Sequence, residues 1–233
     1  MLAFQQLLSD TTPQRNAFIA IPLIQEVLKS GASRPLYIDF LGQAYHHVKN
    51  TAPLLALAAA RCSAEDQTYQ TALFEYIEEE RGHEAWILED IEALGGDAAS
   101  VRHGAPRLPC KVMVGHAYYV VERISPYALL GMVHVLEGMA VALAGSAVAA
   151  LRSSVGTSGE GGFKYLTTHG DLDVEHSALF ADLVERLGAR HLPVITESTA
   201  DFYKLYGDIF RDIDLNRRNA QQPTTSPLYA DSL

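Results

Sequence analysis

Apolar residues recur along most of the chain at spacings of three and four, which is the period of a helix buried on one face. The clearest apolar stripe predicts one helix over residues 35–62. Its members are Tyr37, Leu41, Ala44, Val48, Thr51, Leu55 and Ala58. No convincing run alternates between apolar and polar residues as a half-buried strand would. The pattern therefore predicts an all-α protein.

Helix caps and helix breakers predict five further helices. They span about residues 63–94, 111–123, 126–151, 163–187 and 197–216. Ser63 is a natural N-cap for the first of them, Gly95 is a natural stop, and Pro193 separates the last two. A Gly- and Ser-rich link at 153–162 and a polar tail after residue 217 lie outside the helices. Because no repeat or second domain is visible, we expect a single domain, 1–233, built as a bundle of about seven helices.

Composition narrows the set of partners. The 233 residues carry a net charge of -10 and no basic cluster, so neither nucleic acid nor an anionic membrane is expected to bind. The chain starts without the cationic region of a secretory signal, and its most apolar run, 138–151, is too short to span a bilayer. Cys62 and Cys110 are far apart in the sequence, which favours reduced thiols over a disulfide framework or a zinc site. These features favour a cytoplasmic protein.

The first candidate ligands are Glu80 and His83, in the run Glu-Glu-Glu-Arg-Gly-His-Glu of the second predicted helix. A Glu-x-x-His spacing places a carboxylate and an imidazole on one helix face, as carboxylate-bridged diiron bundles require. A solvated acidic face would have the same sequence. Gly82 favours the ligand interpretation slightly, because glycine is a poor helix former and would let a neighbouring backbone approach.

The second candidate is Glu137, in the most apolar stretch of the chain. An unpaired buried carboxylate is costly, so this one should be paired, protonated or bound to a metal. A salt bridge to a buried Arg is the alternative, but the same helix offers no basic residue before Arg152. His134, one turn earlier, is either a residue of the substrate site or a satisfied core histidine.

The third and strongest cluster is His169, Asp173 and His176, spaced i, i+4 and i+7. At about 100° per residue, their directions fall within roughly 60° of one another. Asp171 and Glu175 point elsewhere and should carry surface charge.

The full set of candidate ligands contains three histidines and three carboxylates. Such hard, mixed nitrogen and oxygen donors suit iron or manganese better than structural zinc, which prefers thiolates. A single ion cannot sensibly use six protein ligands. The set therefore predicts two metal ions with positions left open for dioxygen and substrate.

Several stretches of this sequence resemble the haem-oxygenase-like diiron oxidases and oxygenases, which are relatives of the helical TenA and PqqC proteins. They are YIDFL at 37–41, QAYHHV at 43–48, EEERGHE at 78–84, HVLEG at 134–138 and LTTHGDLDVEH at 166–176. The resemblance covers about residues 18–210. It places the family's ligands on Glu80, His83, Glu137, His169, Asp173 and His176, with no ligand position missing.

The resemblance implies a haem-oxygenase-like fold and two iron ions that bind dioxygen as a peroxo intermediate. The expected reaction is oxidation of a small organic substrate such as an amino acid, a fatty acid or an amine. An external reductant and a homodimer are also expected. TenA thiaminases need a catalytic cysteine, and neither Cys62 nor Cys110 lies in a matching context.

Two histidines next to each other on the first predicted helix have different expected positions. His47 lies at the edge of the apolar stripe and is a candidate for orienting substrate. His46 joins a polar stripe with Asp39, Gln43 and Asn50, and we expect it to be exposed to solvent.

Two other functions remain open. One is a metal-free TenA-like hydrolase or small-molecule binding protein, in which the polar cluster acts as acid and base. The other is a structural or regulatory helical protein.

Overall fold

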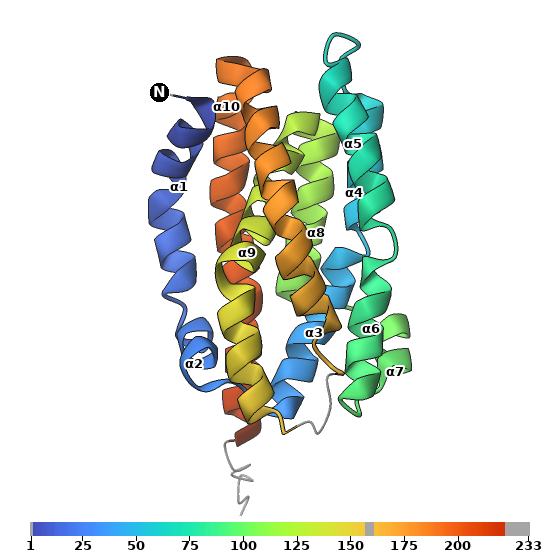
Figure 1. Ribbon diagram of the computed structural model, residues 1–233, viewed down its shortest axis with the longest axis vertical. Helices are drawn as coiled ribbons and strands as arrows, with labels where there is room; N and C mark the ends of the chain where they lie inside the picture. Colours follow the sequence, from blue (N-terminus) through green and yellow to red (C-terminus); the bar gives the residue numbers. More distant parts are fainter. Residues whose placement is uncertain (1, 157–160, 222–233) are drawn as a thin grey trace, which may run out of the picture.

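The computed structural model describes residues 2–156 and 161–221, except for the side chains of residues 169–175. In this part of the chain every regular element is helical, and no strand is present. Most helices stand side by side along the long axis of the molecule (Figure 1). The prediction of an all-α bundle is confirmed.

Two helices precede the first one that the sequence predicted. They are α1 (Ala3–Ile19), which packs along α10, and α2 (Pro22–Ser30), which packs along α9. The backbone N–H groups of Ala3 and Phe4 donate to the carboxylate of Glu185, which caps the free start of α1. The sequence pattern missed α1 because its apolar stripe is weak and Pro13 lies inside it.

The helix expected over residues 35–62 is two helices. α3 covers Arg34–Val48 and α4 covers Thr51–Arg61. Pro53 gives the reason: it has no N–H to bond to the carbonyl of Lys49, but proline is tolerated in the first turn of a helix. The apolar stripe nevertheless continues across the break, because its members are buried in both helices, such as Leu41 in α3 and Leu55 in α4.

The helix expected over residues 63–94 is also divided. α5 covers Gln67–Glu80 and α6 covers His83–Ala93. Between them Gly82 adopts φ +91°, a left-handed conformation that favours glycine. The single continuous helix predicted for Glu80 and His83 is therefore wrong, and these two residues occupy the facing ends of two helices.

The middle of the chain follows the prediction more closely. Short helices lead into α9, which covers Leu129–Ser154 and packs against α2 and α10. The preceding elements are α7 (Ala98–His103), α8 (Leu108–Tyr119), the π-turn η1 (Val120–Ile124) and the 3-10 turn η2 (Pro126–Ala128).

The last two predicted helices are joined as α10 (Lys164–Gln221), which breaks at Gly188 rather than at Pro193. Gly188 adopts φ +60° and ψ -161°, and the chain reverses direction at the top of the bundle (Figure 1). Pro193 lies shortly after the reversal, inside the second half of α10. A left-handed glycine can turn the chain sharply, whereas a proline near a helix start can be accommodated.

One helical run, Pro126–Ser154, is long and apolar enough to cross a membrane by length and composition. It is longer than the 138–151 run that the sequence suggested. Of its most apolar window, 56% is buried inside the molecule, and the core helix of a soluble protein meets the same criterion. Its packing against α2 and α10 is that of a core helix.

Candidate metal centre

Glu80 is the last residue of α5 and His83 is the first of α6. The break at Gly82 still leaves their side chains together, with His83 Nδ1 3.4 Å from Glu80 Oε2. Both side chains are buried, and the His83 ring stacks on Trp86 at 4.0 Å between centroids. The solvated acidic face considered for this pair is therefore wrong for Glu80, which faces the interior.

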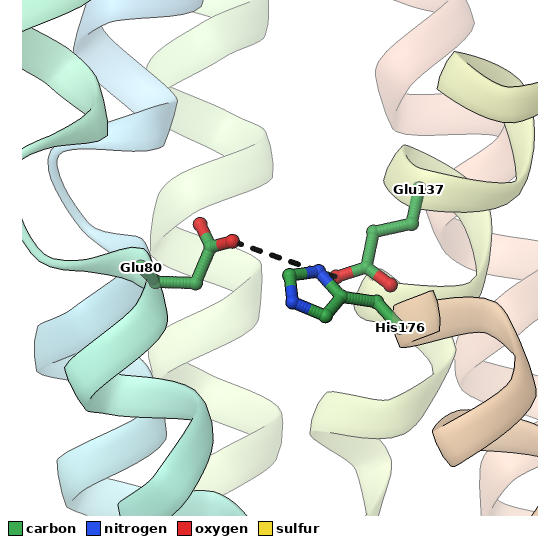
Figure 2. Close-up of side chains that lie close together, drawn as sticks. All are labelled: Glu80, Glu137 and His176. Carbon is green, nitrogen blue, oxygen red and sulfur yellow. Dashed lines mark ion pairs between the residues drawn. The ribbon is translucent and has the colours of Figure 1, made fainter. Parts of the chain in front are cut away.

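Three of the six predicted ligands meet at the centre of the bundle, and Figure 2 shows their side chains directed toward one another. Glu80 comes from α5, Glu137 from α9 and His176 from α10. His176 Nδ1 lies 3.9 Å from Glu80 Oε1 and 3.8 Å from Glu137 Oε1. One ligand atom from each residue lies within 4.8 Å of the other two. Elements far apart in sequence thus place two carboxylates and an imidazole around one point.

A residue that the sequence analysis did not single out completes this arrangement. Glu79 Oε2 lies 2.9 Å from His176 Nε2, on the ring edge opposite to the one that faces Glu80 and Glu137. A hydrogen bond to Glu79 directs the Nδ1 edge of His176 toward the two buried acids. Carboxylate partners of this kind orient and strengthen histidine ligands of metals. Glu79 could have been suspected from its place beside Glu80, but the spacing did not indicate His176 as its partner.

The chemistry of the three side chains fits a cation. Glu80, Glu137 and His176 are exposed by only 6%, 9% and 6%. Two buried carboxylates this close together repel each other, and the described ion pairs that they form are with histidines. A metal ion among these oxygen and nitrogen donors would neutralise that charge, and the donor set suits iron or manganese.

The other two predicted ligands, His169 and Asp173, lie outside the described residues. The main chain of α10 passes through both positions, seven and three residues before His176, but their side chains are among those not described. Their assignment as ligands remains a prediction.

The two histidines predicted near the substrate lie in different places. His47 lines the large apolar cavity that also touches Glu80 and Glu137. His134 is not among the lining residues of this cavity, and its ring packs against Phe4 and Phe180 at 6.1 Å and 5.1 Å between centroids. Burial lowers the pKa of His134 to about 4, so its ring is neutral near pH 7. Its surroundings are those of a core histidine.

The expectation that His46 is exposed is wrong, because its exposure is only 4%. The polar stripe of α3 to which it belongs is covered by α8 and the residues before it. Arg107 pairs with Asp39 and its N–H donates to Gln43, and the Tyr118 hydroxyl donates to Asn50. A polar stripe on a helix predicts exposure to solvent only when no polar groups of another element cover it.

The cavity beside the three ligands has a volume of about 180 Å³. Its walls are mostly aliphatic and aromatic, and Glu80 and Glu137 supply its charged side chains among the described residues. A mostly apolar pocket with a few convergent polar groups is the usual form of a small-molecule site.

Neither cysteine is placed to act as a nucleophile in this cavity. Cys62 and Cys110 are absent from its described lining. Burial raises the pKa of each thiol to about 11, so both remain protonated near neutral pH. A thiolate mechanism of the thiaminase kind therefore has no support from the geometry.

Solved structures share this architecture. A domain of unknown function with a heme oxygenase-like fold from Shewanella denitrificans OS217 is 19% identical, with 97% of each chain covered and a TM-score of 0.85. A TenA homolog from Pseudomonas syringae pv. tomato str. DC3000 is 12% identical over 91% of this chain and 92% of that chain, with a TM-score of 0.77. A CADD-like protein of unknown function from Nostoc punctiforme PCC 73102 is 13% identical over 94% and 96%, with a TM-score of 0.67. These similarities confirm the haem-oxygenase-like fold.

A search of the curated proteins finds no significant match. The sequence profile of a family described as iron-containing redox enzyme matches residues 38–207, well over half of the chain. The matched region contains Glu80, Glu137 and His176, which the fold brings together. The chain belongs to this family of iron-containing redox enzymes.

Proposed function

We propose that this protein is a non-haem diiron oxidase or oxygenase that uses dioxygen to oxidise a small organic substrate. The observation that carries the proposal is the buried group of Glu80, Glu137 and His176, whose two carboxylates border an apolar cavity. Membership of an iron-containing redox family favours iron over other cations that the same donors would accept. Manganese remains compatible with this donor set.

The residues that would hold the metals come from four helices, α5, α6, α9 and α10. Glu80, Glu137 and His176 would supply three ligands, and His83 beside Glu80 would supply a fourth. By prediction, His169 and Asp173 complete the set. Two iron(II) ions bound there would supply electrons and open coordination positions for dioxygen.

The rest of the site controls position and water. Glu79 fixes which edge of the His176 ring faces the acids. The aliphatic and aromatic walls of the cavity exclude water from a bound substrate, which strengthens the electrostatic interactions at the acids. His47 is the imidazole of this wall and is proposed to orient the substrate.

Anaerobic titration with Fe(II) tests the proposal. Because six ligands exceed the needs of one ion, we expect saturation near two equivalents per chain, followed by a new absorption band when oxygen is admitted. The same titration with Mn(II) shows whether the site discriminates between the two metals. Saturation at zero equivalents would eliminate the diiron proposal, and a single tight equivalent would require a mononuclear site.

The metal-free TenA-like hydrolase or binding protein is the rival to this proposal. Such a protein would bind its ligand at full affinity after chelator treatment. The high pKa of Cys62 and Cys110 disfavours the cysteine-dependent version of this rival.

The proposal includes three expectations about the cellular setting. They are an external reductant, a homodimer and a cytoplasmic location. Sedimentation velocity of the purified full chain measures the oligomeric state directly.

A further inference from the structure

The cavity beside the candidate metal centre is elongated, and most of its lining is apolar. Its lining residues on α9 recur every three or four positions from Met132 to Leu151. At 1.5 Å per residue, the lining residues therefore span roughly 28 Å of this helix. Glu137 lies near one end of the stretch and Leu151 lies at the other. A compact substrate would leave most of this length empty.

The lining chemistry disfavours a zwitterionic substrate. Among the described residues, no Lys or Arg lines the cavity, and its charged side chains, Glu80 and Glu137, lie near the same end. The carboxylate of an amino acid in the apolar part would be buried without a cationic partner, which is costly. An apolar chain, in contrast, gains free energy for each methylene that it buries there.

Small side chains on α9 leave space in the apolar part of the cavity. Ala140, Ala144 and Ala147 all line the cavity and share one face of the helix at spacings of four and three. Ala144 and Ala147 lie about 10 Å and 15 Å beyond Glu137 along the helix axis. A larger side chain at either position would fill space that is now empty.

We propose that the cavity binds a straight-chain aliphatic molecule with one polar end, and that Ala144 and Ala147 set the length of chain that it accepts. The polar end lies at Glu80 and Glu137, and the chain extends along α9 toward Leu151. The identification of this molecule as the substrate rests on the proposed oxidase function, whereas its binding does not.

Isothermal titration calorimetry with a homologous series from 1-hexanol to 1-dodecanol, on the metal-free full-length protein, tests the proposal. Affinity should rise roughly fourfold per added methylene, which is the ~0.8 kcal/mol gained by burying a CH₂. Because 14 residues of helix, about 21 Å, separate Glu137 from Leu151, the rise in the parent should continue through the whole series. L-leucine and L-tyrosine are expected to show no binding at the same concentrations.

Three variants locate the chain on α9. Ala147→Phe should make the rise in affinity stop within the series, and Ala144→Phe should make it stop at a shorter alcohol. Ala149→Phe is the matched control, because Ala149 is on the same helix but exposed to solvent, and it should behave as the parent does. Thermal unfolding of each variant checks that it is folded, and Ala147, which is only partly buried, carries the test if Ala144→Phe does not fold.

The possible outcomes separate this inference from the proposed function. Affinity that does not depend on chain length, tighter binding of an amino acid, or an Ala149→Phe effect as large as that of Ala147→Phe overturns the inference. Iron stoichiometry is measured on the same Ala147→Phe protein and should remain near two. Length-dependent alcohol binding without any iron binding would contradict the diiron proposal alone, and two irons without alcohol binding would contradict the inference alone.

Discussion

At the level of single residues, Glu79 offers the sharpest test of the candidate centre, because its role depends on one contact. It bonds the Nε2 edge of His176 and leaves Nδ1 facing the two buried acids. Glu79→Ala should weaken Fe(II) binding about 10- to 100-fold, the usual effect of losing such a partner of a ligand histidine. Competition with a chelator of known affinity measures the change.

Glu78 supplies the control for this variant. It is the neighbouring acid, its side chain is 74% exposed, and it pairs with Arg81 on the surface. Glu78→Ala removes the same charge from the same helix end and should leave Fe(II) affinity within about twofold, as expected for an exposed site. Equal losses in both variants would mean that Glu79 acts through general charge rather than through His176.

Glu137 is expected to be necessary for metal binding and to lower the stability of the metal-free protein. Glu137→Gln keeps the volume of the side chain and removes a charge that lies in the interior close to Glu80. Fe(II) uptake should fall to one equivalent or less. The metal-free protein should be at least as stable as the parent, with a gain of about 1 kcal/mol, because a buried acid beside another acid is costly. Metal analysis and denaturant unfolding of the metal-free form measure the two effects. Full iron uptake by this variant would remove Glu137 from the ligand set.

At the level of helices, the turn between α5 and α6 sets the position of Glu80 against His83. Gly82 adopts φ +91°, and nothing lies within 4 Å of the Cβ that another residue would place there. Gly82→Ala should therefore destabilise the protein by about 1–2 kcal/mol through the backbone alone.

Gly115→Ala is the matched control for the Gly82 variant. Gly115 lies inside α8, is exposed, and also has nothing within 4 Å of its added Cβ. Alanine is the better residue in a helix interior, so this variant should be more stable than the parent by about 0.5–1 kcal/mol. The same substitution thus has opposite expected effects on stability in a left-handed turn and inside a helix. Unfolding of the two proteins in urea measures both, and a stabilising Gly82→Ala would contradict the left-handed turn.

The register of α10 is open to a separate test. The spacing of His169, Asp173 and His176 predicts that they share one side of this helix and that Asp171 and Glu175 are turned away from it. Replacing Asp173 or His176 with Ala should cut iron affinity sharply, and His169→Ala should lose at least one of the two metals. Replacing Asp171 or Glu175 should change the free energy of unfolding by only a few tenths of a kcal/mol and leave iron binding intact. If all five variants lose iron equally, the ligand assignment on this helix is wrong.

At the level of the whole molecule, buried histidines make stability depend on pH. Burial, followed by the nearby Lys49, lowers the pKa of His46 to about 4 from its usual 6.5. Between pH 6.5 and 4 the unfolded chain therefore binds a proton that the folded chain does not. The contribution of His46 to stability is complete above pH 6.5 and is lost as the pH falls.

His46→Gln should flatten this dependence. Over the window from pH 6.5 to pH 5, the parent should lose about 1–2 kcal/mol more than the variant does. His103 is exposed, and His103→Gln should follow the parent. Urea unfolding at several pH values gives the comparison. Parallel curves for His46→Gln and the parent would mean that His46 is protonated in the folded state.

The sequence by itself determined the fold class of the protein and which residues form its candidate centre. A period of three to four apolar residues is a local property, so the all-α fold and α9 could be predicted without tertiary information. Buried acids and histidines are rare enough in apolar helices that Glu80, Glu137 and His176 stood out, and the fold brings these three together. The assignment of these three residues, and of His83, His169 and Asp173, as metal ligands remains a prediction.

Only the tertiary structure decided the features that depend on what covers each helix. The break between Val48 and Thr51 leaves the apolar stripe intact, and the turn at Gly82 depends on a left-handed backbone, so periodicity revealed neither. Arg107 and Tyr118 bond to Asp39 and Asn50 of the polar stripe, and His46 in the same stripe is buried although its own helix predicts exposure. The partnership of Glu79 with His176 and the long cavity along α9 arise between helices distant in sequence. A helical period determines which side of a helix is apolar, and contacts between helices determine what that side meets.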